Sequence, residues 1–443
     1  MKKLLIGFLL VWGASLHAET LDLKGAIDRA LKTDPRIEEQ RHLVDAARAQ
    51  IQEALGHKKL SYHVNTFVGI APGVDGGFFD EKGRVRNDLY DPQGLSAWFA
   101  VQLSIIKPLF TFGKIEHYAA AAQGQVDVRR EDVRLRQGKT ILDVKKAYYG
   151  YLTARETRRL LVDVKGRVER ALRLVDRWLE EGTGNVKPSD RYALESGIAL
   201  LEKSIAEAEG VEKVALDGLK VLTGIGLGHP LEVADKDLKP LPLPQAPLDA
   251  LKEKALEKRP EQAQLEAGLR ARRHLVAAHK AEKKPNLYTG ILGYAAYAPN
   301  RSRLNNPFIF DLFNTAGATP VIGIDWKWES GVQPAQVAKA KAELEALVSK
   351  ADFARRGIPF EVAEAYYKVH AYHRGMEAMA QSSRAARRWM IASYADFEAG
   401  LEEAVKVMEA FKGYVLAHTD YLNTIYEYNM QVATLQKVTG DYP

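Results

Sequence analysis

The sequence predicts a mostly α-helical fold with a small β part, built twice from one unit of helix, strand, strand, long helix and helix. Three observations lead to this fold class. A proline-free stretch runs from Lys114 to Glu181, four short segments alternate between apolar and polar residues, and the features of the first half recur in the second. A repeat of this length determines the whole architecture.

Residues 1–18 have the layout of a secretory signal peptide. Lys2 and Lys3 precede an apolar run from Leu4 to Trp12, and small residues end at Ala18. The run is too short to remain as a membrane anchor. The chain has no cysteine, which excludes disulfides and a lipid-modified N-terminal cysteine. We therefore expect an exported protein that is cleaved after Ala18.

The charge balance favours no nucleic-acid partner. The 63 basic and 57 acidic residues leave a net charge of only +6 in a chain of 443 residues. No basic cluster is interleaved with aromatic residues in the way that nucleic-acid-binding surfaces are. The charges are therefore interpreted as solvated protein surface.

The first repeat, residues 19–228, opens with a helical region that breaks near Asp34-Pro35. Strands are predicted at about 61–72 and 97–107, because apolar and polar residues alternate there with a period of two. The polar, glycine-rich residues 73–95 form a loop between them. The segment from Pro108 to Gly113 then turns the chain into the next helix.

The long helix is predicted over residues 114–181. Its apolar residues recur at alternating steps of three and four, the pattern of a helix packed along a coiled-coil seam; they are Leu161, Val164, Val168, Ala171, Val175 and Trp178. Such a helix is ~100 Å long, too long for an ordinary compact core. A turn near Gly182 leads to a return helix over 189–222, and residues 229–247 form a proline-rich linker.

The second repeat, residues 248–443, carries the same elements. Arg259-Pro260 corresponds to Asp34-Pro35 at an offset of 225, and Gly400 corresponds to Gly184 at an offset of 216. Strands are expected at about 287–298 and 319–328, followed through Gly331 by a long helical region over 333–398 and a return helix over 401–439. Because Gly357 and Pro359 interrupt this second long helix, we predict a kink or a break there.

The four strands predict a membrane β-barrel. Each is long enough to cross a bilayer when tilted, and aromatic residues gather near the strand ends as in interfacial girdles: Tyr62, Trp98, Phe99, Tyr288, Tyr294, Tyr297, Trp326 and Trp328. Four strands cannot close on themselves, and an open edge cannot face lipid, so this interpretation requires an oligomer. Two chains would give eight strands and a filled interior, whereas three would give twelve and a lumen. The alternative is that the hairpins belong to a soluble coiled-coil stalk.

No enzyme is predicted. His370 and His373 are spaced to share a metal on one helix, but no third ligand lies nearby in the sequence, and a solvated helix face is the simpler interpretation. The sequence has no glycine-rich phosphate loop, no zinc-protease helix and no nucleophile elbow. We expect no catalytic residues, no metal and no cofactor.

Several segments resemble those of the outer-membrane efflux protein family, the TolC-like channel-tunnels. They are Lys107 to Gly113 at the strand-to-helix junction, Gly184 with Asp190, and Asp420 to Asn423 leading to Leu435 and Gly440. The duplication carries more weight than any of them. The resemblance implies a homotrimer with a shared twelve-stranded barrel in outer-membrane lipid, continued by a periplasmic tunnel of twelve coiled helices. It also implies a periplasmic adaptor and an inner-membrane pump as partners, and passive conduction of drugs, toxic compounds or other exported substrates.

The resemblance also places a gate at the periplasmic helix tips. The candidate gate residues are Asp190, Tyr394, Asp396, Phe397, Glu402, Glu403, Lys406 and Glu409. Two of them have simpler explanations, because Glu402 and Lys406 could form an ordinary i, i+4 ion pair and Asp190 could be a helix N-terminal acid. The predicted function is an outer-membrane export channel of a tripartite system. The alternative is a soluble periplasmic coiled-coil adaptor or scaffold protein.

Overall fold

The computed structural model describes residues 19–74, 82–85, 90–184, 186–303 and 310–441, so the expected signal peptide lies outside the described residues. The chain forms two compact units. Among the described residues, the first unit comprises those within 19–42, 130–263 and 351–441, and the second comprises those within 43–129 and 264–350. Both units therefore draw on both repeats, because the long helices pass from one unit to the other.

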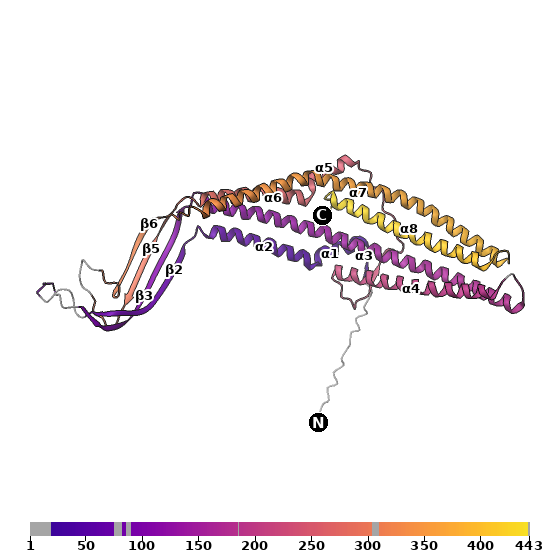
Figure 1. Ribbon diagram of the computed structural model, residues 1–443, viewed down its shortest axis with the longest axis horizontal. Helices are drawn as coiled ribbons and strands as arrows, with labels where there is room; N and C mark the ends of the chain where they lie inside the picture. The colour runs from indigo at the N-terminus through magenta and orange to yellow at the C-terminus, as the bar shows by residue number, and fades with distance from the viewer. Residues whose placement is uncertain (1–18, 75–81, 86–89, 185, 304–309, 442–443) are drawn as a thin grey trace, which may run out of the picture. The chain divides into compact units, whose positions relative to one another are not determined.

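Eight helices are described, and they make the fold mostly helical. They are α1 (Leu23–Thr33), α2 (Pro35–Gly56), α3 (Lys114–Glu181), α4 (Pro188–Thr223), α5 (Leu248–Lys258), α6 (Pro260–Ala281), α7 (Val332–Glu398) and α8 (Ala404–Val438) (Figure 1). The first four match the last four in order and relative length, as expected from the duplication. Gly184 and Gly400, at φ of 73° and 74°, adopt the left-handed conformation in the turns that follow α3 and α7.

The second unit contains one antiparallel sheet with strand order β2-β3-β5-β6. Its strands are β2 (Ser61–Val74), β3 (Tyr90–Phe110), β5 (Asn286–Tyr297) and β6 (Thr315–Asp325), which lie side by side in Figure 1. The two strands of the first hairpin, β2 and β3, are longer than expected. The expected loops lie partly outside the described residues. By contrast, β6 ends at Asp325, because Asn286, the first residue of β5, is the last available pairing partner. Trp326 and Trp328 therefore follow the strand.

Of the kink or break predicted in the second long helix, the break is wrong, because α7 continues through Pro359; the kink stays a prediction. A proline inside a helix removes one hydrogen bond and costs about 3 kcal/mol. Here Ile358 and Val362 on either side of it are 4% and 0% exposed and belong to a large apolar core. Their burial stabilises the helical conformation and offsets that cost.

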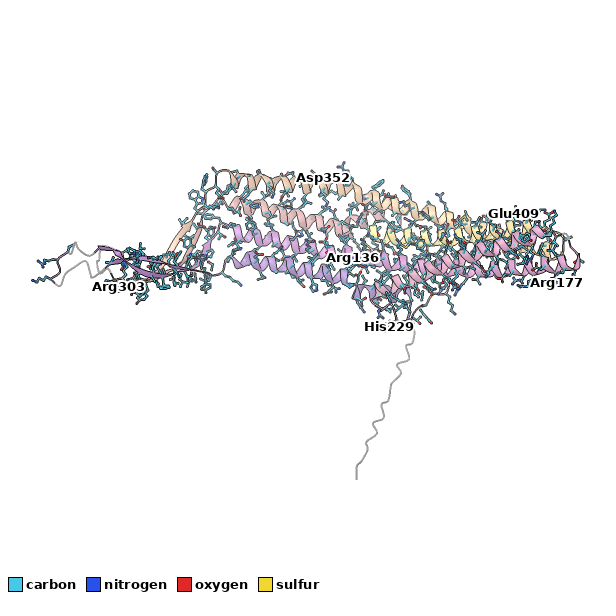
Figure 2. All side chains as sticks on the ribbon, turned by 60° about the horizontal axis from the view of Figure 1, so that its bottom comes forward. Arg136, Arg177, His229, Arg303, Asp352 and Glu409 are labelled. Carbon is cyan, nitrogen blue, oxygen red and sulfur yellow. The ribbon has the colours of Figure 1, made fainter. Side chains whose placement is uncertain are left out.

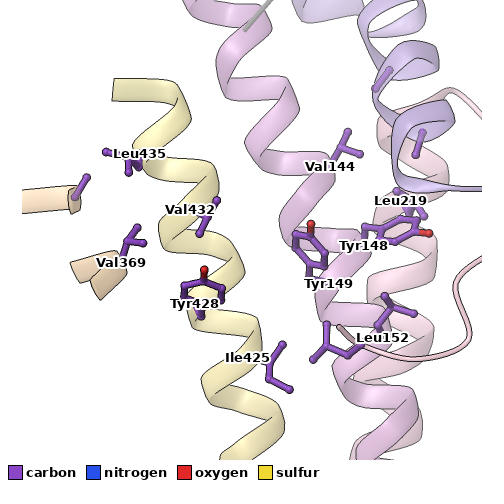
Figure 3. Close-up of a cluster of buried hydrophobic side chains, with 14 of the residues drawn as sticks. Val144, Tyr148, Tyr149, Leu152, Leu219, Val369, Ile425, Tyr428, Val432 and Leu435 are labelled. Carbon is purple, nitrogen blue, oxygen red and sulfur yellow. The ribbon is translucent and has the colours of Figure 1, made fainter. Parts of the chain in front are cut away.

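Two apolar cores hold the first unit together, and one of them follows the predicted seam. One contains Val144, Tyr148, Val369, Ile425 and Tyr428, drawn from α3, α7 and α8 (Figure 3). The other lies farther along the same helices and contains the buried α3 residues at the predicted steps, which are Val164, Val168, Ala171 and Val175. The three-four spacing of these positions is thus confirmed as the buried face of α3.

The proline-rich segment between the repeats packs against the first unit. Strand β4 (Leu231–Val233) pairs in parallel with β1 (Glu19–Leu21). Farther along, the fully buried side chain of Asn429 accepts from the Leu241 backbone N–H at 2.8 Å and donates to the Lys239 carbonyl oxygen at 2.9 Å. These bonds satisfy the backbone of a segment that cannot satisfy itself in a helix or sheet. The segment therefore contributes to the packing of the first unit in addition to connecting the repeats.

Candidate functional site

The sheet of the second unit has one strongly apolar face. In an antiparallel sheet, residues directly opposite one another lie on the same face. Val64 pairs with Leu103, Leu103 pairs with Gly293 and Gly293 pairs with Ala318. Exposed apolar residues of this face include Val68 at 77% and Ile322 at 77%. Each large apolar side chain that is left in water forgoes about 1.5–3 kcal/mol of burial, so this face requires an apolar covering.

The opposite face of the sheet is more polar. His63 pairs with Ser104, Ser104 with Leu292 and Leu292 with Thr319; the next row contains Asn65, Gln102 and Tyr294. A sheet with one apolar and one polar face separates two environments. Alternation of this kind along each strand is also the pattern of a membrane barrel with a polar interior.

The two outer strands of this sheet have free edges. Within the described part of the chain, β2 pairs only with β3, and β6 pairs only with β5. Each edge presents unpaired backbone N–H and C=O groups, which are costly wherever water is absent. The sheet is therefore incomplete as a membrane-spanning structure and needs further strands on both sides.

A cavity of about 1680 Å³ adjoins the polar face and continues along the helices of the second unit. Ser104, Tyr288 and Leu292 contribute to it from the sheet, and residues of α2, α3, α6 and α7 complete its wall. Its charged lining residues include both signs; they are Glu53, Lys114, Arg272, Glu282, Asp325, Glu343 and Lys350. Such a wall is hydrated and does not strongly favour cations or anions.

A hydrogen-bonded network fixes one part of this wall. The Tyr118 hydroxyl donates to Glu282 Oε1 at 2.5 Å, and His279 Nδ1 lies 3.0 Å from Glu282 Oε2. Burial, assisted by the bond to Glu282, raises the pKa of Tyr118. Burial alone would raise the pKa of Glu282, but the bonds from Tyr118 and His279 outweigh it and lower that pKa. Glu282 therefore remains a carboxylate whose charge is held by its neighbours.

The strand-to-helix junctions differ between the repeats. In the first, Pro108 lies at a bulge in β3, and Phe112 and Gly113 both adopt positive φ, at 52° and 81°. A non-glycine residue at positive φ is strained; Phe112 is held by Phe110, whose ring centroid is 4.7 Å away, and by the Lys284 ammonium above its ring. In the second, Gly331 lies in the turn just before α7.

The eight aromatic residues that the sequence singled out lie in three places. Tyr62, Phe99 and Tyr297 lie on the apolar face, in register with its other rows. Trp98, Tyr288 and Tyr294 lie on the polar face, where Trp98 packs against Phe67 and Phe313. Trp326 and Trp328 follow β6 and contact each other edge to face.

At the tips of the first unit, some of the predicted gate residues serve the packing of the helices. Phe397 is fully buried and contacts Trp178 edge to face, with ring centroids 5.3 Å apart. Asp190 is also buried, and its carboxylate accepts from the Lys187 backbone N–H at 2.8 Å as part of the α4 cap. Tyr394 is half-buried beside Phe411; burial, followed by its hydrogen bond to Glu398, raises its pKa.

The other predicted gate residues remain available at the surface of the chain. Asp396, Glu403, Lys406 and Glu409 are exposed, and Glu402 is half-buried. Figure 2 shows Glu409 near the end of the helices that also carries Arg177. Glu402 precedes the first residue of α8, so it cannot form a helical i, i+4 pair with Lys406. None of these five charges has an ion-pair partner within the described residues.

The Tyr118–Glu282–His279 network could not be predicted from the sequence, because Tyr118 and Glu282 are 164 positions apart and carry no local motif. His370 and His373 contact different aromatic neighbours, Tyr366 and Tyr428. No group of three or more His, Asp or Glu in the described ranges is placed to hold a metal ion. None of the described helices combines the length and the apolarity needed to cross a membrane.

A family model described as outer membrane efflux protein matches residues 68–189 and 251–441. The chain belongs to this family. The resemblance to TolC-like channels is thereby confirmed, and the two matched segments fall one in each repeat. A search of curated proteins found no match.

The fold is also that of solved outer-membrane channels. A membrane protein from Pseudomonas aeruginosa superposes with a TM-score of 0.76 at 16% identity, covering 94% of this chain and 90% of that one. The Campylobacter jejuni CmeC outer membrane channel gives a TM-score of 0.76 at 15% identity over 95% and 85% of the two chains. The open state of the Neisseria gonorrhoeae MtrE outer membrane channel gives 0.71 at 18% identity over 94% and 88%.

Proposed function

We propose that three copies of this efflux-family chain close a twelve-stranded barrel in the outer membrane and conduct exported substrates out of the cell. The observation that carries the proposal is the open four-stranded sheet with one apolar face, one polar face and two free edges. Neighbouring copies would pair β6 with β2 and satisfy both edges. Twelve strands leave a lumen, whereas eight would be filled by side chains.

The apolar face then contacts lipid and the polar face lines the lumen. Tyr62, Phe99 and Tyr297 supply the interfacial aromatics on the lipid side. On the other side, the cavity with its mixed charges becomes part of the lumen wall. Such a wall suits passive conduction of varied small molecules, including drugs and toxic compounds, better than selection of one ion.

The long helices extend the conduit into the periplasm, where the tips meet a periplasmic adaptor and an inner-membrane pump. We propose that the exposed charges Asp396, Glu402, Glu403, Lys406 and Glu409 line the entrance at these tips. Four acids and one lysine leave an acidic excess, and none is paired within the described chain. Asp190, Tyr394 and Phe397 would support this gate by fixing the helix ends.

Planar-bilayer recording of the detergent-purified protein tests the proposed function. We expect discrete conductance steps that are absent from an identical preparation of cells lacking the protein. A protein that fractionates wholly with the soluble periplasm and adds no conductance would contradict the channel. That result would instead favour a soluble coiled-coil adaptor or scaffold.

A further inference from the structure

A buried ion cluster closes the break between α1 and α2. The Asp34 side chain is 3% exposed and accepts from Arg36 Nε and Nη2, both at 2.9 Å. Thr140 Oγ1 on α3 donates to Asp34 Oδ2 at 2.6 Å, and Arg136 Nη2 lies 3.8 Å from the same oxygen. Asp143 lies 3.3 Å from Arg36 and 3.5 Å from Arg136. The break is thereby docked on α3.

A second ion cluster, centred on the buried Arg259 side chain, closes the break between α5 and α6. The Arg259 side chain is 8% exposed and donates to Glu261 from Nη2 at 2.8 Å and from Nε at 3.2 Å. Its Nη1 donates to Glu361 on α7 at 2.5 Å. This break is thereby docked on α7, and both clusters lie within the first unit.

The two clusters occupy corresponding positions of the two repeats with the signs of three residues inverted. At the offset of 225, Asp34 corresponds to Arg259, Arg36 to Glu261 and Arg136 to Glu361. Asp143 corresponds to Lys368, which has the opposite sign but is exposed and pairs with Glu364. The apolar neighbours do not change in this way. Ala30 and Ala255, and likewise Val144 and Val369, are identical pairs at the same offset, and all four are 0% exposed. The duplicated packing is thus retained while the charge is reversed.

This reversal can determine which long helix receives each break, since α6 packs against both long helices. Within the second unit, His274 of α6 lies 3.3 Å from His117 of α3, and Arg272 of α6 forms an ion pair with Glu343 of α7. Within the first unit, Arg134 of α3 donates to the Lys258 carbonyl oxygen at 3.4 Å. Apolar packing alone would allow either break to dock on either long helix, because the apolar positions are equivalent.

We propose that the inverted clusters make docking repeat-specific, so that the Asp34 break is accepted by α3 and the Arg259 break by α7. Exchanged docking would place Asp34 beside Glu361 and Arg259 beside Arg136. Each exchange leaves a buried charge facing a like charge, which is strongly destabilising. The signs therefore act as repulsive elements against the wrong pairing, in addition to stabilising the correct one. The partner of each surface is a segment of this same chain.

Transplanting each cluster into the other repeat tests the proposal. The first variant carries Asp34→Arg, Arg36→Glu, Arg136→Glu and Asp143→Lys, which gives both breaks the polarity of the second repeat. The second carries Arg259→Asp, Glu261→Arg and Glu361→Arg, which gives both the polarity of the first; Lys368 is kept because it pairs with Glu364. The third combines all seven changes. Each variant keeps opposite charges facing within every cluster.

The readout is the yield of folded, monodisperse protein in detergent and its thermal midpoint, neither of which depends on channel activity. We expect each single-repeat transplant to lower the yield by about half or more, because correct and exchanged docking then carry the same charges and neither is favoured by electrostatics. The seven-residue variant restores the inversion and should recover the yield of the natural chain. Two outcomes overturn the proposal: single-repeat transplants that fold like the natural chain, or a seven-residue variant whose loss equals the two separate losses combined.

Discussion

A lysine placed on the centre of β6 should distinguish the two faces of the sheet. Ala318 and Thr319 are neighbours, both exposed in the single chain, but they point to opposite faces. Ala318 belongs to the apolar row with Gly293, and Thr319 belongs to the polar row with Leu292. Ala318→Lys is therefore the perturbation, and Thr319→Lys is its matched control.

The expected magnitude follows from the depth of these positions. Strand β6 runs from Thr315 to Asp325, so Ala318 is two residues from the strand midpoint at Pro320. Two residues span about 7 Å along a strand, which keeps Ala318 well inside an apolar band ~25 Å tall. A lysine on the lipid face near the midplane costs about 2–4 kcal/mol, a roughly 30- to 700-fold change in the folding equilibrium. Thr319→Lys, although nearer the midpoint, should change stability little because the proposed barrel turns its face toward the lumen.

Guanidinium unfolding of the protein reconstituted in phospholipid vesicles, followed by tryptophan fluorescence, measures both variants against the natural chain. The lipid assignment predicts a large loss for Ala318→Lys and almost none for Thr319→Lys. Equal effects of the two lysines would refute it. A larger loss for Thr319→Lys would show that the faces had been assigned the wrong way round.

Three further predictions concern packing, pH and conduction. A Cβ at Gly124 on α3 would lie 2.8 Å from the Ala271 Cβ on α6, so Gly124→Ala should lower the thermal midpoint of unfolding. Gly210 has open space around it, so Gly210→Ala should stabilise the helix by about 1 kcal/mol and raise the midpoint. A rise in both variants would contradict the close approach of α3 and α6. Burial, followed by the charge of Arg387, lowers the pKa of His418, so the native state resists its protonation. The free energy of unfolding should therefore decline as pH falls below 6.5, because the unfolded chain takes up the proton on His418 more readily than the native chain. A pH titration of His418→Gln should lack this decline. Glu409→Gln should reduce the preference for cations in bilayer recordings, and an unchanged reversal potential would remove Glu409 from the conduction path.

Local periodicity was enough to predict the helices and the sheet. The buried face of α3 follows the steps from Val164 to Val175 because a helix repeats its face every three to four residues. The alternation in β2 likewise placed Val64 and Val68 on one face. These patterns are properties of neighbouring residues, so they can be seen before any tertiary contact is known.

Features that depend on distant partners could not be predicted in this way. The helix continues through Pro359 because of the core around Ile358, and β6 ends at Asp325 because its partner strand begins at Asn286. The family resemblance placed Phe397 among the gate residues, and its burial against Trp178 depends on a helix more than two hundred positions away. The opposite charges of Asp34 and Arg259 could be read from the sequence, yet their significance emerged only from their partners on α3 and α7.

In the proposed channel, one chain supplies an incomplete sheet that three chains complete. The mass of the intact oligomer, measured by native mass spectrometry after release from detergent, tests this most directly. We predict a complex of three mature chains that is obtained only in detergent or lipid. A single chain that is monodisperse in buffer without detergent, with its apolar face and strand edges exposed to water, would contradict the proposed trimer.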